Sequence, residues 1–312
     1  MRRYVLKRLF QAIFVLLAVL SLVFIIGRQI GDPARLILGL EAPEADVVAL
    51  REEMGLNDPI FVQYGRFLVR AVQGDFGTSY WQGVPTIELV LERIPATLFL
   101  SALAFGSAVP LAILIGVLAA VRPGSFMDRL TTVLSLAGVC IVDFWLALML
   151  IIFVSVRLGW LPTSGFVGVG LAGLPFAILP VATLILGPVG RVAQLTRIAM
   201  IEEINQAYVK TARAKGLSEY LVLGKHALKN ALIPTITLSG DVLISLMNGV
   251  IIVEFIFAWP GVGQLLMQAI QRRDLPTIET LVFTTTVMVV CVNLVVDMTY
   301  AYINPRIRYD SA

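Results

Sequence analysis

Long apolar stretches alternate with shorter polar segments along this chain. A helix needs about 20 apolar residues to cross the hydrocarbon core of a bilayer. Stretches of roughly that length or more occur at 9–27, 96–121, 130–156, 176–196, 235–258 and 278–303. Few charged residues fall inside them, as expected where hydrocarbon excludes ionised groups. The pattern predicts an all-α membrane protein with six transmembrane helices.

The amino-acid composition agrees with a membrane protein and excludes a water-soluble one. The 312 residues are 58% hydrophobic and 14% charged, whereas a soluble globular domain carries about one quarter charged residues. These values exclude a water-soluble fold. Cys140 and Cys291 both lie within apolar stretches, which favours packing roles and predicts neither a disulfide framework nor a metal site.

The N-terminus is basic, with Arg2, Arg3, Lys7 and Arg8 before the first apolar stretch. That stretch is longer than the roughly 7–15 apolar residues of a signal peptide and does not end at small residues of the cleavage type. We therefore expect an uncleaved first span at 9–27.

Lys and Arg are unevenly distributed between the polar segments. With the N-terminus in the cytoplasm, the interior segments 1–8, 122–129, 197–234 and 304–312 carry 14 of them and the exterior segments carry nine. The positive-inside rule then places both termini in the cytoplasm.

The segment 28–95 is the largest exterior segment and shows helical spacing of apolar residues with glycine and proline punctuation. We expect ordered helices there. Two interpretations stay open: the helices rest on the outer membrane surface, or they form a docking surface for another protein.

The interior segment 197–234 has a helix–glycine–helix pattern. Helices are predicted over 198–215 and 219–231, with Gly216 in the left-handed conformation between them, Ser218 as an N-cap and Pro234 as the end. A stiff, bent helical hairpin under the membrane follows. It could rest on anionic lipid or dock a cytoplasmic partner; a DNA-reading role is unfavourable because both ends are tethered to spans.

This hairpin carries a family resemblance. The strings Gln206–Leu217 (QAYVKTARAKGL) and His226–Pro234 (HALKNALIP) resemble the cytoplasmic "EAA" loop of ABC importer permeases of the dipeptide, oligopeptide and nickel subfamily. Further matching motifs are Gly31–Pro33, Met54–Pro59, Gly74–Ser79, Arg93–Thr97, Arg157–Pro162, Phe257–Gly263, Arg273–Pro276 and Asn304–Tyr309. The resemblance spans essentially the whole chain.

The resemblance implies a type I permease: an N-terminal part, 1–95, with an extra span and an extracytoplasmic helical region, and a five-span core, 96–312. It implies a multi-pass protein of the bacterial inner membrane. The implied partners are a second permease, two cytoplasmic ATP-binding subunits and a substrate-binding protein, and nucleic acid is not among them. The implied contact with the ATPase is the set Ala212, Arg213, Ala214, Lys215, Gly216 and Leu217, with His226 and Asn230 behind it.

The chain itself is not expected to be an enzyme or to hold a cofactor. The phosphate-binding pattern G-x-x-x-x-G-K-[ST] is absent, since Gly224-Lys225 is followed by His226. A single histidine excludes H-E-x-x-H zinc sites, and no G-x-S-x-G motif occurs. ATP and Mg²⁺ would therefore be bound by partner subunits.

Ionisable residues inside the spans are candidate functional groups, because each costs at least ~2.5 kcal/mol at the bilayer centre. We expect Asp143, Asp241, Asn248 and Asn293 to line the translocation path and to favour substrates with amino or cationic groups; helix–helix hydrogen bonding is the alternative. The family commonly has proline where Val142 stands here. Its loss predicts a straight helix over 130–156.

The expected function is import of di- or oligopeptides delivered by a binding protein. The same machinery could import a nickel chelate, glutathione or another small solute. A secondary transporter driven by an ion gradient is the alternative from another class, but the inverted repeats typical of many such proteins are not found in this sequence. One histidine gives no support to metal cargo.

Overall fold

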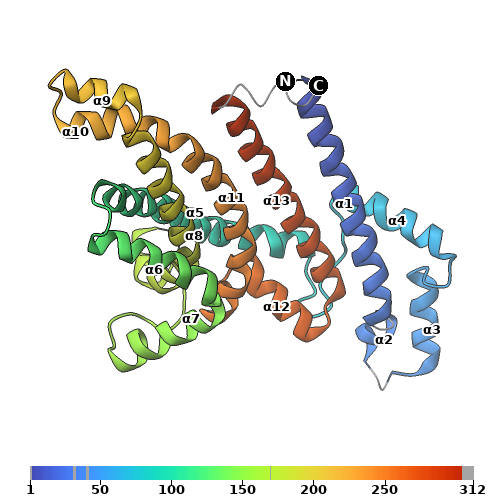
Figure 1. Cartoon of the computed structure of the whole chain (residues 1–312). Helices are drawn as coiled ribbons and strands as arrows, with labels where there is room; N and C mark the ends of the chain where they lie inside the picture. Colours follow the sequence, from blue (N-terminus) through green and yellow to red (C-terminus); the bar gives the residue numbers. More distant parts are fainter. Residues whose placement is uncertain (1, 31–32, 40–41, 169, 304–312) are drawn as a thin grey trace. The chain divides into compact units, whose positions relative to one another are not determined.

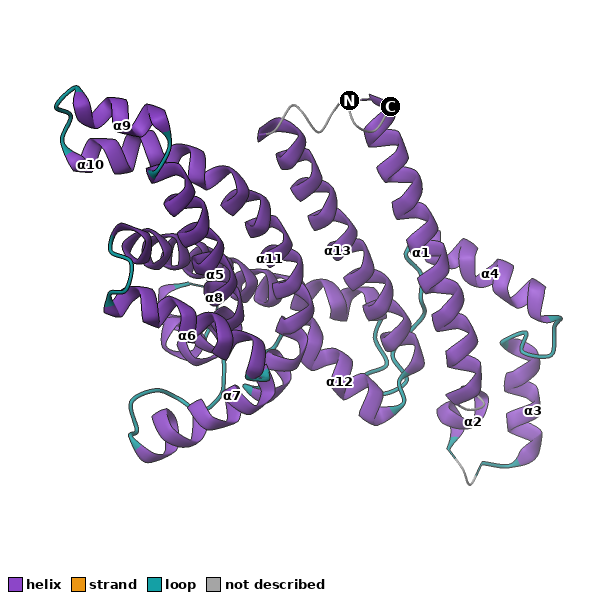
Figure 2. Ribbon diagram, in the orientation of Figure 1, coloured by secondary structure: helices purple, strands orange, loops and turns teal. Residues whose placement is uncertain are grey.

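The computed structural model describes residues 2–30, 33–39, 42–168 and 170–303. The motif residues Gly31 and Asp32 and the motif Asn304–Tyr309 therefore lie outside the described residues. Regular structure in the described part is helical (Figure 2), apart from one isolated bridge between Thr78 and Pro85. This confirms the predicted all-α class.

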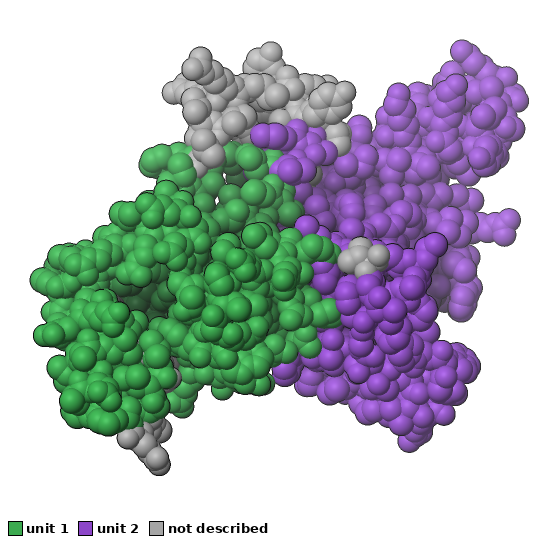
Figure 3. Space-filling model, turned by 180° about the vertical axis from the view of Figure 1, so that it is seen from behind, with its two compact units in different colours: residues 1–95, 260–294, 308–312 green, residues 96–259, 295–307 purple. Residues whose placement is uncertain are grey.

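The chain divides into two compact units, coloured separately in Figure 3. Unit 1 comprises residues 1–95, 260–294 and 308–312, and unit 2 comprises 96–259 and 295–307. Helices α5 (Thr86–Val121) and α13 (Leu275–Ile303) have residues in both units. The other helices of unit 1 are α1 (Arg2–Ile30), α2 (Pro33–Leu38), α3 (Glu44–Glu53), α4 (Ile60–Gln73) and α12 (Val262–Arg272).

In unit 2, α8 and α11 pack against each other and α6 packs against α8 (Figure 1). The elements of this unit are α6 (Phe126–Cys140), α7 (Asp143–Leu150) with a π-helical continuation (Ile151–Arg157), a 3₁₀ turn (Leu171–Gly173), α8 (Leu174–Ile204), α9 (Ala207–Ala214), α10 (Glu219–Leu221), a second π-helical turn (Val222–Ala227) and α11 (Leu228–Ile256).

Among the described residues, five helical segments are long and apolar enough to cross a membrane. They are Phe10–Gly27, Thr86–Val121, Leu171–Ile204, Glu219–Ile256 and Leu275–Thr299. The pair Phe126–Cys140 and Asp143–Arg157 is bent by 108° and makes a sixth span if counted as one. The expected number of spans is therefore reached only with a broken helix.

The predicted straight helix over 130–156 was wrong. Ile141 and Val142 are extended (φ −90°, ψ 122° and φ −78°, ψ 134°) and separate α6 from α7. Both are β-branched and favour extended backbone, and Asp143 places a carboxylate in the first turn of α7, where the helix dipole favours it. The break thus persists without a proline.

The helices predicted within 197–234 also begin and end differently from the prediction. Helix α8 continues from the membrane span to Ile204, so the break falls at Asn205–Gln206 instead of before residue 198. Pro234 lies inside α11 and does not end it. Ala231 and Thr235, on either side of Pro234, are fully buried. Their packing keeps the segment helical although the proline removes one backbone hydrogen bond.

Close contact between α6 and α8 organises the core of unit 2. A Cβ atom on Gly138 would lie 2.7 Å from the Gly187 Cα, and one on Gly190 would lie 2.5 Å from the Leu134 carbonyl oxygen. Only glycine permits this approach. Small residues at helix interfaces allow membrane helices to pack closely. At one end of the core, the buried Trp259 indole N–H donates to the Ala96 carbonyl at 3.0 Å.

Candidate functional site

Helices α9 and α10 form a hairpin beyond the ends of α8 and α11 (Figure 1). Gly216 joins them with φ +78°, the left-handed conformation predicted from the sequence. Its N–H donates to the Arg213 carbonyl at 2.9 Å, which ends α9. Ser218 is the N-cap of α10, but its side chain makes no cap hydrogen bond.

An ion pair fastens the tip of the hairpin. The Arg213 guanidinium donates to both carboxylate oxygens of Glu219, at 2.6 and 3.1 Å. This bond raises the pKa of Arg213 above its ordinary value. Because the pair is bidentate, it fixes the direction of the turn as well as its ends.

The legs of the hairpin are tied through Tyr208. Its hydroxyl accepts a hydrogen bond from the Asn230 amide at 3.0 Å and donates to Glu203. Burial, followed by the bond to Glu203, raises the pKa of Tyr208. Val209 and Val222 are fully buried between the legs. The hairpin is therefore a stiff element continuous with two candidate spans.

The six predicted contact residues fall into two groups. Ala212 is buried with Val209 and Val222 and faces the inside of the hairpin. The other five are exposed, as is Tyr220, whose side chain is 86% accessible. Tyr220 was not among the residues predicted from the sequence, and only its exposure draws attention to it. Of the two residues expected behind the contact, Asn230 donates to the Tyr208 hydroxyl, and the backbone carbonyl oxygen of His226 lies 3.3 Å from that hydroxyl.

A polar stripe runs along one exposed face of α11. Asp241, Ser245 and Asn248 are spaced four and three residues apart, so they share that face. Their side chains are exposed in the chain on its own, although the helix is otherwise apolar. Exposed polar groups at bilayer depth are unfavourable against lipid. This face is consequently expected to meet water or another protein.

Asp143 and Ser245 of the polar stripe both line a cavity of about 270 Å³. The cavity is lined by Asp143 from α7, Arg191 from α8 and Ser245 and Gly249 from α11. Arg191 donates to the Ser245 hydroxyl at 3.5 Å, and a Cβ on Gly249 would lie 3.7 Å from an Asp143 carboxylate oxygen. The structure thus brings Asp143 near the Asp241 and Asn248 face. Asn293 lies on α13, in unit 1, whereas the other three residues belong to unit 2.

In unit 1, two sequence motifs far apart in the chain meet. The buried Asp274 carboxylate accepts hydrogen bonds from the Ser79 hydroxyl, the Tyr80 N–H at 3.0 Å and the Thr277 hydroxyl at 2.7 Å. These bonds fix the loop before α5 against the junction of α12 and α13. Nearby, burial, then the Glu279 and Asp274 carboxylates, raises the pKa of Tyr80 to about 12, so its hydroxyl stays a hydrogen-bond donor.

Comparison with known proteins gives independent evidence of the family to which the chain belongs. Residues 112–309 match the family described as binding-protein-dependent transport system inner membrane component, and residues 1–101 match the N-terminal part of the same systems. The chain is 40% identical to the oligopeptide transport system permease protein AppB of Bacillus subtilis (strain 168), over 99% of this chain and 100% of that one.

It is 42% identical to the glutathione transport system permease protein GsiC of Salmonella paratyphi A (strain ATCC 9150 / SARB42), over 99% and 100% of the two chains. Among solved structures, it resembles a chain of the MetNI methionine ABC transporter in an inward-facing conformation. That likeness has a TM-score of 0.53 at 18% identity and covers 70% of this chain and 97% of the other; it concerns the fold alone.

Proposed function

The chain belongs to the family of binding-protein-dependent transport system inner membrane components, and from that premise we propose that its cargo is peptide. Membership confirms the predicted resemblance: the chain is a multi-pass inner membrane protein and a permease subunit of an ABC importer, not itself catalytic. Such a system includes ATPase subunits and a substrate-binding protein. A peptide cargo is supported by full-length relatives named for oligopeptide and for glutathione, itself a tripeptide.

The proposed translocation path uses the polar stripe of α11. Asp241, Asn248 and the cavity at Asp143 supply carboxylate and amide oxygens along an exposed face that lipid would not solvate well. These groups favour a cargo with a free amino group or a cationic side chain. Asn293 is kept as a member of this path from the sequence alone. The other side of the path is proposed to be a second, similar permease, which would cover the exposed face.

The proposed contact with the ATPase is the exposed tip of the hairpin. Arg213, Ala214, Lys215, Gly216 and Leu217 are all accessible there, and Tyr220 adds an aromatic anchor of the kind enriched at protein interfaces. Ala212 would support this surface from within. Because the hairpin is tied internally and continuous with α8 and α11, movement of an ATPase subunit can shift both helices as a rigid body.

The proposed orientation places the hairpin and both termini in the cytoplasm, following the distribution of Lys and Arg. Single cysteines at Ser218 and at Ser125 test it with a membrane-impermeant thiol reagent in right-side-out vesicles. Both positions are expected to react only after the vesicles are opened. A cysteine at Thr78, in the predicted exterior segment, is the positive control for labelling from outside.

Co-purification tests the machinery, and uptake tests the cargo. A tagged chain is expected to retain two ATPase copies, and Lys215→Glu with Tyr220→Ala should release them while Lys7→Glu should not. In liposomes containing the complete importer, Asp143→Asn is expected to reduce uptake of a cationic peptide more than that of a neutral one. Unchanged uptake of both peptides by Asp143→Asn would remove Asp143 from the path.

A further inference from the structure

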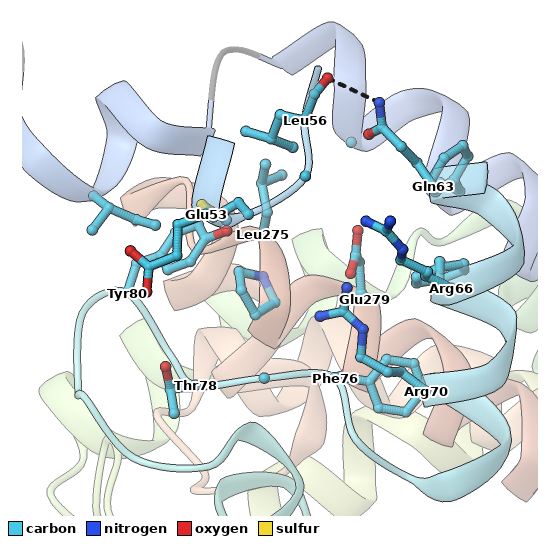
Figure 4. Close-up of a pocket in the computed structure, with 18 of the residues that line it drawn as sticks. Glu53, Leu56, Gln63, Arg66, Arg70, Phe76, Thr78, Tyr80, Leu275 and Glu279 are labelled. Atoms are coloured by element: carbon cyan, nitrogen blue, oxygen red, sulfur yellow. Dashed lines mark hydrogen bonds between the residues drawn. The ribbon is translucent and has the colours of Figure 1, made fainter. Parts of the chain in front are cut away.

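Two cavities, one in each unit, are lined by side chains of both charges. In unit 1, the Glu279 carboxylate lies between Arg66 and Arg70 in a cavity of about 900 Å³ (Figure 4). The chain itself therefore supplies an anion to these arginines. In unit 2, Asp143 and Arg191 line the cavity of about 270 Å³, and no ion pair joins the two side chains among the described residues. The charges of this second cavity are available to a ligand.

A break in a candidate span opens onto the cavity in unit 2. The chain bends by 108° between α6 and α7, where Ile141 and Val142 are extended. Val142 is 63% exposed, so the rest of this chain does not cover the break. Non-helical backbone at membrane depth is tolerated only where protein buries it or where it lines a water-filled cavity. Because Val139 and Asp143, on either side of the break, both line the cavity, the second case is favoured here.

Asp143 and Arg191 are neighbours of opposite charge. Arg191 lies close enough to Asp143 for the two charges to attract each other, but its guanidinium donates to the Ser245 hydroxyl on α11, at 3.5 Å. Both charged side chains are exposed in the chain on its own. Each charge lowers the cost of holding the other within the candidate spans, and an unpaired charge there is unfavourable. A cargo that pairs with only one of them leaves the other unpaired, so a cargo that carries both an ammonium group and a carboxylate is favoured.

The size of the cavity in unit 2 favours a short molecule. Three glycines, Gly138, Gly187 and Gly249, contribute to its lining, and a Cβ on Gly249 would lie 3.7 Å from an Asp143 carboxylate oxygen. The volume of about 270 Å³ lies just below the roughly 300–1,000 Å³ of sites for drug-sized ligands. A di- or tripeptide spans only about 7–10 Å when extended. Its two charged ends therefore stay close enough together to meet both charges of one small cavity.

We propose that this cavity recognises both charged ends of a short peptide. Asp143 binds the terminal ammonium group, and Arg191 binds the terminal carboxylate, with the Ser245 hydroxyl as a further donor. The planar guanidinium matches the geometry of a carboxylate. The cargo supplies one charge of each sign to a cavity that holds one of each sign, so no charge is left unpaired. This role rests on the proposed function and deepens it, because it adds Arg191 to the path and names a short peptide with two free ends as the cargo.

Uptake of three related peptides by the complete importer in proteoliposomes tests this role. Trialanine has both charged ends, trialanine amide has only the ammonium group, and N-acetyltrialanine has only the carboxylate. Each labelled peptide saturates the binding protein and is compared between wild type and variant, so the selectivity of the binding protein cancels. Arg191→Gln should lower uptake of trialanine and N-acetyltrialanine about tenfold, the effect of losing one charge-assisted hydrogen bond, and should not lower uptake of the amide. Asp143→Asn should lower uptake of trialanine and the amide and spare N-acetyltrialanine.

Two further variants complete the test. Ser245→Ala is a milder change that keeps both charges, and it should lower uptake of trialanine and N-acetyltrialanine about fivefold but not that of the amide. Arg122→Gln, at an exposed arginine that does not line this cavity, is the matched control and should transport all three peptides as wild type does. Equal losses of the three peptides in both Arg191→Gln and Ser245→Ala, or no loss in either, would overturn the role of the cavity and leave peptide import intact. Absence of uptake of every peptide by the wild type would overturn the proposed function as well.

Discussion

The Ser79 hydroxyl donates a hydrogen bond to the Asp274 carboxylate across 195 positions of the chain, and both side chains are buried. The same carboxylate accepts from the Tyr80 N–H and the Thr277 hydroxyl. One acidic side chain therefore holds the loop before α5 to the start of α13. Three donors on a buried carboxylate compensate for its removal from water.

Replacing Asp274 should loosen unit 1. Asp274→Asn presents an amide N–H₂ group to partners that are themselves donors, and we expect a loss of about 2–4 kcal/mol in the free energy of unfolding. Faster proteolysis between residues 74 and 85 and a lower melting temperature of the detergent-solubilised protein should report it. Glu52→Gln, at an exposed carboxylate, is the control and should change neither. Equal protease resistance of Asp274→Asn and wild type would contradict the assigned role.

Tyr80 should make unit 1 sensitive to alkaline pH. Its folded pKa of about 12 lies above the ordinary value of 10, so the folded state holds this proton more tightly than the unfolded state. The resulting stability is present in full below pH 10 and is lost as the pH rises from 10 to 12. The difference in absorbance at 295 nm between wild type and Tyr80→Phe should titrate near pH 12. A midpoint near 10 would contradict the burial of this hydroxyl.

Local features of this fold could be predicted from sequence, and distant pairings could not. The helix–glycine–helix hairpin follows from Gly216, because a glycine between two helical patterns sets a left-handed turn within a few residues. The pairing of Ser79 with Asp274 carries no local signal, since each residue alone fits an ordinary turn. The break at Ile141 and Val142 was not predicted because no proline marks it; here two β-branched residues before an acidic helix start favour the extended backbone instead.

The candidate site shows the same limit. Asp241 and Asn248 were placed on one face by helical spacing alone, and the structure exposes both. Arg191 and Ser245 line the cavity at Asp143 because of the way α7, α8 and α11 pack. The spacing of residues within one helix does not predict that packing. The inward direction of Ala212 also depends on packing, in this case against Val222 of the other leg.

Trp259 should be the strongest single anchor of unit 2. It is fully buried, its indole donates to Ala96, and its ring lies 4.8 Å from that of Phe166. Trp259→Ala should lower the free energy of unfolding by about 3–5 kcal/mol, and Trp259→Phe by about 1–2 kcal/mol through the lost hydrogen bond. Chemical denaturation in detergent measures both. Trp160→Phe, at a tryptophan 73% exposed, should change stability by less than about 0.5 kcal/mol.

Glycine should be required at position 216 because of the backbone conformation there, and not because a side chain would clash with a neighbour. A Cβ atom there would meet nothing within 4 Å, but φ is +78°. Gly216→Val therefore strains the turn, by at least about 1–2 kcal/mol, and should reduce stimulation of the ATPase by the loaded binding protein. Asparagine tolerates this conformation better than other residues, so Gly216→Asn should retain most of the stimulation. Equal losses in both variants would show that the side-chain surface matters and the turn does not.

The most direct test of the account is ATP-dependent peptide uptake into proteoliposomes that contain this chain, its second permease and its ATPase subunits, with the binding protein outside. We expect labelled tripeptide to accumulate only when ATP and the binding protein are both present, and Gly216→Val to abolish the accumulation while Gly216→Asn preserves it. Accumulation by the chain alone, driven by an ion gradient without ATPase subunits, would contradict the account.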